Sequence, residues 1–116
     1  MATYSSVTLS GSTSGRLIAI QTTGPLGTTV HTAASSTGVH DEVHLWAQNL
    51  STANALCFLQ LGGTSTLDEI IYTVPGRDGL HTISPGLRLE GGVVTRAYAT
   101  STDVLLLGGY VNRITP

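Results

Sequence analysis

A chain of 116 residues is long enough for one compact domain with its own hydrophobic core. Charged residues make up only 10% of the chain and the formal net charge is −2, so it lacks the basic surface that binding to nucleic acid requires. All five basic residues are arginine, whose planar side chain suits contacts at protein interfaces. We therefore expect one domain over residues 1–116, with a sparsely charged surface and no nucleic-acid partner.

The N-terminal sequence and the aliphatic runs predict no contact with a membrane. MATYSSVTLS has neither the basic region nor the apolar region of a signal peptide. The longest aliphatic runs, LIAI and VLLL, are far too short to span a bilayer. We therefore expect a chain that is neither exported by a signal peptide nor bound to a membrane.

Short apolar or alternating runs recur along the chain, as they do in all-β domains. In chain order they are SVTLS, RLIAIQT, TTVHTA, EVHLWAQNL, ALCFLQL, EIIYTV, LHTI, LRLEG, VVTRAYAT and VLLLGGYV. The segments between them are GSTSG, GPLG, SSTG, LSTAN, GGTS, PGRDG and SPG, which are typical of turns. The pattern predicts about eight strands in a single-domain antiparallel β-sandwich, with a jelly roll as the expected subtype.

Two of the predicted strands are apolar on both faces. In residues 55–61, Cys57 and Leu59 alternate with Leu56 and Phe58, and residues 104–107 are Val-Leu-Leu-Leu. One sandwich core covers only one face of each strand, so we expect another subunit or a folded-back loop to cover the other face. Cys57, the single cysteine, is expected to be an inert core residue.

The stretch HDEVH, residues 40–44, has two histidines four apart with carboxylates between them. The metalloprotease motif needs a helix and a glutamate directly after the first histidine, but that position is Asp41. We favour a strand with Val43, Leu45 and Ala47 facing inward. In a strand, His40 and His44 would lie about 13 Å apart, too far to share a zinc ion. We therefore expect no metal site here.

Other catalytic templates fail as well. GSTSG resembles the G-x-S-x-G nucleophile motif, but its central residue is Thr13. A phosphate-binding loop of the Walker type needs a lysine, which the chain lacks, and the Gly-Gly pairs at 62–63, 91–92 and 108–109 are interpreted as hairpin turns or bulges. We expect no catalytic residue, no cofactor and no enzyme activity, although the sequence leaves open a triad formed by residues distant in the chain.

The blocks VHLWAQNLS, LQLGGT, IIYTVPGRDGLHTISPGLRLEGG, VTRAYA and GYVNRI resemble small β-sandwich structural proteins of tailed bacteriophage virions, particularly capsid decoration or cement proteins. The resemblance covers about residues 43–114 and rests on the order of strand and turn blocks. It implies a non-enzymatic homotrimer that is made in the host cytoplasm, binds the major capsid protein across capsomer boundaries on the capsid surface, and stabilises the head. Head fibres and tail proteins contain similar modules, and no functional residue of the family can be transferred.

Two other classes remain open on the residues alone. A carbohydrate-binding module would need an exposed row of aromatic side chains. The candidates for such a row are Trp46, Phe58 and the four tyrosines. A small enzyme of the cupin kind would need several metal ligands that converge inside the barrel. Its candidate ligands are His31, His40, His44 and His81.

The segment of residues 2–14 is the predicted partner-binding region. It carries no charge before Arg16, and Tyr4, Val7 and Leu9 could add an extended strand to the sheet edge of a neighbouring molecule. Main-chain hydrogen bonds would then supply affinity without particular side chains. The alternative is that this segment is the first strand of the chain's own sandwich.

Overall fold

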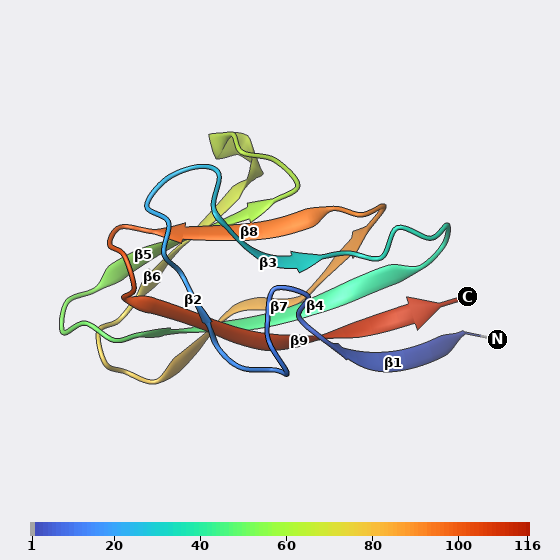
Figure 1. The fold of residues 1–116 in the computed structure, drawn as a ribbon, viewed down its shortest axis with the longest axis horizontal. Coiled ribbons are helices and arrows are strands. Elements are labelled where there is room, and N and C mark those ends of the chain that lie inside the picture. Colours follow the sequence, from blue (N-terminus) through green and yellow to red (C-terminus); the bar gives the residue numbers. More distant parts are fainter. Residues whose placement is uncertain (1) are drawn as a thin grey trace.

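The computed structural model describes residues 2–116, and its strands form two antiparallel sheets packed face to face (Figure 1). The first sheet, sheet A, has the order β1-β9-β4-β7, and the short β2 also pairs with β9. The second sheet, sheet B, has the order β3-β8-β5-β6. The strands of sheet A are β1 (Thr3–Thr8), β2 (Ile18–Ala19), β4 (His40–Asn49), β7 (Leu80–Glu90) and β9 (Leu105–Thr115). Those of sheet B are β3 (Thr28–Thr32), β5 (Ala55–Leu61), β6 (Glu69–Val74) and β8 (Val94–Ala99).

The prediction of a single-domain antiparallel β-sandwich is confirmed. The one helical element of the described residues is a short 3-10 turn, η1 (Thr66–Asp68), which Ser65 caps just before β6. The strand pairs are nested in the sequence: β5 pairs with β6, β4 with β7, β3 with β8, and β1 with β9. The chain therefore follows the course of one long antiparallel ribbon folded over on itself.

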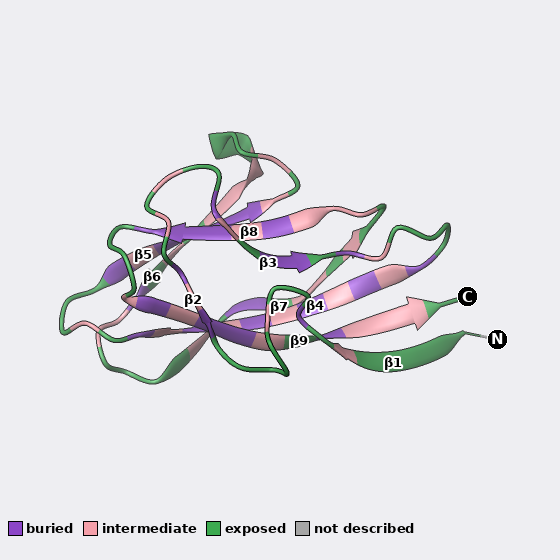
Figure 2. Ribbon diagram, viewed as in Figure 1, coloured by how far each residue is buried: buried purple, intermediate pink, exposed green. Residues whose placement is uncertain are grey.

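Strict alternation along the strands builds the core between the sheets. In β4 every second residue from Asp41 to Asn49 is buried, and the residues between them are half-buried on the outer face (Figure 2). The prediction that Val43, Leu45 and Ala47 face inward is confirmed, since each is at most 1% exposed. Their cross-strand partners on β9 include Val111 and Leu107, which are also fully buried. The inward faces of both sheets thus form one apolar core.

The predicted break at Ser84-Pro85-Gly86 is wrong. The runs LHTI and LRLEG belong to one continuous strand, β7, whose pairing with β4 shifts register on either side of the pair His44 and Leu45. Because β7 lies at the edge of sheet A, Pro85 can remain in the strand despite its missing N–H group. Gly86 has a φ of 101°, which accommodates the irregular backbone at this point.

The interpretation of Gly108-Gly109 as a turn or bulge is also wrong. Both glycines lie within β9, which pairs with β4 in unbroken register from Asn49 to His40. A side chain at Gly109 would collide with the carbonyl oxygen of His44 on the neighbouring strand. Gly109 therefore allows the two central strands of sheet A to approach each other closely, whereas Gly108 leaves room for the side chains of Leu17 and Trp46.

Candidate functional site

The predicted partner-binding segment forms β1 at one edge of sheet A. Its six residues pair with β9 from Thr3 opposite Thr115 to Thr8 opposite Tyr110. The strand therefore belongs to the chain's own sandwich, as the alternative interpretation held. The side of β1 that faces away from β9 pairs with no strand within residues 2–116, and most residues of β1 are exposed (Figure 2). Tyr4 is 71% exposed on the outer side.

The four predicted partner-binding residues do not form one surface. Val7 is half-buried and packs against the core, whereas Leu9 is 1% exposed inside it. Leu9 therefore cannot contact a partner, because its side chain fills the space between the sheets. Arg16 lies in the exposed loop between β1 and β2, where its carbonyl oxygen accepts a hydrogen bond of 2.6 Å from the Ser12 hydroxyl.

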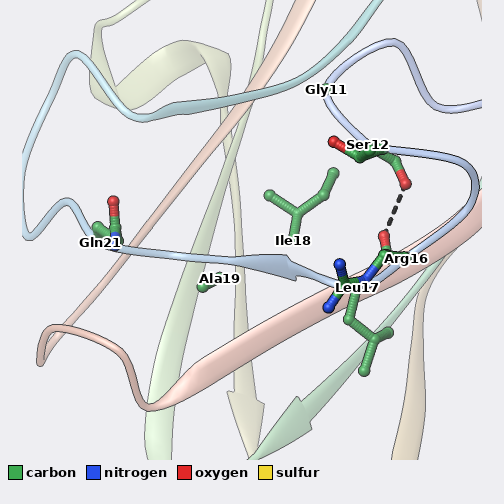
Figure 3. A pocket seen from close by; sticks show the side chains of 8 residues that line it. Gly11, Ser12, Arg16, Leu17, Ile18, Ala19 and Gln21 are labelled. Carbon is green, nitrogen blue, oxygen red and sulfur yellow. Dashed lines mark hydrogen bonds between the residues drawn. The ribbon is translucent and has the colours of Figure 1, made fainter.

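The loop around Arg16 borders an open hollow of about 360 Å³ (Figure 3). Two neighbouring residues, Leu17 and Ile18, point to opposite sides of the short strand, so Ile18 enters the core while Leu17 remains 46% exposed. The hollow is lined by Gly11, Ser12, Thr13, Arg16, Leu17, Ile18, Ala19 and Gln21. Arg16 is the one charged side chain in this lining, and Ser12, Thr13 and Gln21 are its neutral polar side chains.

Strand β1 is the least protected of the four sheet edges. Proteins usually block an edge strand with charge, proline, a bulge or short length, because its free N–H and C=O groups can pair with another chain. At the other edges, β7 carries Pro85, Arg88 and Glu90, β6 begins at Glu69, and β3 is short with a register shift after Thr29. Strand β1 has six residues without charge, proline or irregular register. It can therefore accept a further strand.

The strand prediction for HDEVH is confirmed, because β4 begins at His40. The four histidines do not converge: His40 and His44 lie on the outer face of sheet A, and His31 is buried in the core. His81 lies on β7, with Nε2 3.2 Å from Oδ2 of Asp78. Within residues 2–116, no group of three or more His, Cys, Asp or Glu side chains is placed to hold a metal ion.

A buried polar network that the sequence did not reveal joins β3, β4 and β9. The carboxylate of Asp41 is fully buried and accepts hydrogen bonds from His31 Nε2 (2.8 Å), Ala34 N–H (3.1 Å) and Arg113 (2.8 and 3.0 Å). His31 Nδ1 accepts from the Ser10 N–H group, so the proton of the imidazole lies on Nε2. The ring is thus held on both sides within the core. Because His31 is only 1% exposed, we assign these hydrogen bonds a structural role, in which they hold the three strands together.

The pKa of Asp41 reflects this network. Burial of the carboxyl group opposes its charge, but the hydrogen bonds from Arg113, His31 and Ala34, with the positive charge of Arg113, outweigh burial and lower the pKa to about 2. Elsewhere in the core, burial raises the pKa of Cys57 to about 12. Cys57 is fully buried, as expected of a core residue, and its thiol stays protonated at neutral pH.

A cluster of three aromatic rings lies on the outer face of sheet A. His44 and Trp46 alternate along β4 with the buried residues, and Tyr110 lies opposite His44 on β9. The His44 and Tyr110 rings stack with centroids 4.8 Å apart and planes inclined by 7°. The Trp46 and Tyr110 centroids are 6.2 Å apart. The alternation in EVHLWAQNL predicted an outward Trp46, but the alternation within one strand does not reveal the register that brings Tyr110 beside it.

Comparison of the chain with protein-family models, with curated proteins and with solved structures gave no significant match. Among the described residues, no helix is long and apolar enough to cross a bilayer.

Proposed function

We propose that the chain is a non-enzymatic structural protein of a phage virion, of the capsid decoration type. It binds the major capsid protein on the surface of the head through the free edge of β1, and the head fibre or tail remains the alternative position. The observation that carries the proposal is the six-residue edge of β1, which is uncharged and in regular register. An added strand would gain main-chain hydrogen bonds along this edge. The resemblance of residues 43–114 to decoration proteins supplies the biological setting.

The nested strand pairing supports the jelly-roll subtype of the sandwich. Each strand of the first half pairs with its counterpart in the second half, from β1 with β9 inward to β5 with β6. Consecutive strands from β2 to β5 and from β6 to β9 alternate between the two sheets. A jelly roll arises from this folding of one antiparallel ribbon.

The outer face of sheet B is the proposed contact between copies of the chain in a homotrimer. Phe58 on β5 lies opposite Ile71 on β6 and stacks on Tyr98 of β8, with ring centroids 4.5 Å apart. Ile71 is 56% exposed in the single chain, and Leu56 and Phe58 are half-buried. The Tyr98 hydroxyl donates to Glu69 at 2.6 Å, which leaves the centre of this face apolar. These side chains form the apolar patch predicted from the doubly apolar strand.

Replacing Ile71 with lysine is expected to dissociate the trimer, because it places a charge in the centre of the apolar patch. Light scattering should give about 36 kDa for the wild type, three chains of 12.0 kDa, and about 12 kDa for Ile71→Lys. Thr102→Lys adds the same charge in the exposed loop between β8 and β9, outside the patch, and as the control it should remain a trimer. A wild-type chain that scatters as a monomer at micromolar concentration would contradict this assembly.

Replacing Ser6 with lysine is expected to abolish binding to phage heads without changing the trimer, because a charged residue in the middle of β1 protects the edge from pairing. The measurement is co-sedimentation with heads purified from the phage that encodes the chain, grown without its gene. The variant should sediment with the heads at least tenfold less than the wild type, while Thr102→Lys binds normally. Equal binding by Ser6→Lys and wild type would show that β1 is not the contact with the shell.

A further inference from the structure

Glycines on the two strands beside β4 leave room for the aromatic cluster on the outer face of sheet A. A Cβ atom at Gly86 on β7 would lie 3.1 Å from Cε1 of His44, and one at Gly108 on β9 would lie 2.9 Å from Nε1 of Trp46. The two rings therefore extend over the adjacent strands. Leu17 reaches the same space above Gly108 and continues the apolar surface.

The polar atoms of the cluster are not used inside the protein. Among residues 2–116, the imidazole of His44, the indole N–H of Trp46 and the hydroxyl of Tyr110 make no hydrogen bond. The Phe58 and Tyr98 pair on sheet B differs in this respect, since the Tyr98 hydroxyl is bound to Glu69. The cluster on sheet A thus combines an apolar surface with free donors and acceptors.

The row of outward side chains continues along β4 from the cluster into a hollow. Gln48 is the next outward residue after Trp46, and it lines an open hollow of about 480 Å³ together with Asn49, Leu50, Arg77 and Gly79. From His44 to Gln48 the row extends about 13 Å along the strand. An elongated ligand could therefore lie on the rings at one end and contact an amide and a guanidinium at the other.

This combination fits a neutral sugar chain better than other ligands. Sugar rings have an apolar C–H face that packs on aromatic rings, and hydroxyl groups that hydrogen-bond with amide and guanidinium groups. A purely apolar ligand would need an enclosed pocket, whereas this surface is open. A single-stranded nucleic acid would need a basic groove beside the rings. On this face of the sheet Arg88 lies opposite Glu42 and 3.5 Å from Glu90, so its charge is balanced by carboxylates.

We propose that the outer face of sheet A binds a neutral oligosaccharide, with a sugar ring on His44, Trp46 and Tyr110 and a further sugar unit at Gln48 and Arg77. This inference is independent of the proposed role in a virion, because it uses a different surface from the edge of β1 and the patch on sheet B. The chemical class of the ligand is an uncharged chain of pyranose units.

Trp46, the only tryptophan of the chain, is a built-in fluorescent reporter for this site. The purified full-length protein is titrated with cellohexaose, chitohexaose and maltohexaose, which differ in linkage and substituents. We expect a saturable change in the Trp46 emission with at least one of them. The absence of a saturable change with all three at millimolar concentration would overturn the proposal.

Two tyrosine variants localise the binding. Tyr110→Ala should weaken the association by about tenfold, the loss expected for one aromatic contact. Tyr4→Ala removes an exposed tyrosine from β1, outside the cluster, and should stay within twofold of the wild type. Equal effects of the two variants would overturn the proposal, as would a Tyr110→Ala variant that changes the light-scattering mass and leaves sugar binding intact, since the face would then be a contact between chains.

Discussion

Replacing Asp41 with asparagine is expected to lower the free energy of unfolding by about 3 kcal/mol, within the range for breaking a buried charge pair. Both carboxylate oxygens accept hydrogen bonds from N–H donors. An amide has only one acceptor oxygen, so its NH₂ group would face either the Arg113 side or the His31 side as donor against donor. Urea unfolding followed by Trp46 fluorescence measures the change.

The same variant should also change the acid dependence of stability. The pKa of Asp41 is about 2 in the folded chain, against an ordinary aspartate value of 3.8, so the folded state favours the charged carboxylate. Its contribution is complete above the unfolded pKa and is lost as pH falls through the folded pKa. The difference in unfolding free energy between wild type and Asp41→Asn should therefore shrink by about 2 kcal/mol between pH 5 and pH 2.

Asp103→Asn is the matched control for this experiment. It makes the same chemical change at an exposed loop position with a φ of 59°, a conformation that asparagine tolerates well. Its unfolding free energy should stay within about 0.5 kcal/mol of the wild type. If Asp103→Asn and Asp41→Asn were equally stable, the buried hydrogen-bond network would not stabilise the packing of β3, β4 and β9.

Replacing Gly109 with alanine is expected to destabilise the fold by about 3 kcal/mol or more, the upper end of the range for overpacking. The added Cβ would collide with the carbonyl oxygen of His44 and lie 3.1 Å from Cα of Leu45. These are backbone atoms of the paired central strand, so they cannot move away as a flexible side chain would. The expected result is a lower midpoint of urea unfolding and, in a fraction of the protein, aggregation.

Gly24→Ala tests whether this loss is specific to the position. Gly24 lies in the loop before β3, and an added Cβ there meets no atom within 4 Å. This variant should be as stable as the wild type to within about 0.5 kcal/mol. A Gly109→Ala protein with the stability of Gly24→Ala would mean that β4 and β9 can separate at no cost.

The strands of this chain were predictable because their inward residues alternate with period two. EVHLWAQNL is the clearest case, since the buried positions of β4 follow directly from it. Glycine and proline inside strands were misleading. Ser84-Pro85-Gly86 and Gly108-Gly109 have the composition of turns. The first is tolerated at an edge strand, and in the second Gly109 is required by a close backbone approach. Both reasons depend on neighbours that are distant in sequence.

The candidate sites were less predictable for the same reason. The exposed, uncharged β1 could be anticipated from the composition of residues 2–14, but the burial of Leu9 could not, because it depends on where the chain leaves the sheet. The pairing of His44 with Tyr110 and of Asp41 with Arg113 requires the register between β4 and β9. A one-residue slip of that register would place the two members of each pair on opposite faces of the sheet.

The pairing of β1 with β9 brings both ends of the chain to the same edge of the molecule, where Thr3 lies opposite Thr115 (Figure 1). A peptide or domain fused to either terminus would therefore emerge from the same position. A short linker could also join the two ends and allow the chain to be opened elsewhere, since circular permutation succeeds where termini are close and the new break lies in an exposed loop. The loop of residues 62–65 between β5 and η1, which is largely exposed, offers such a break.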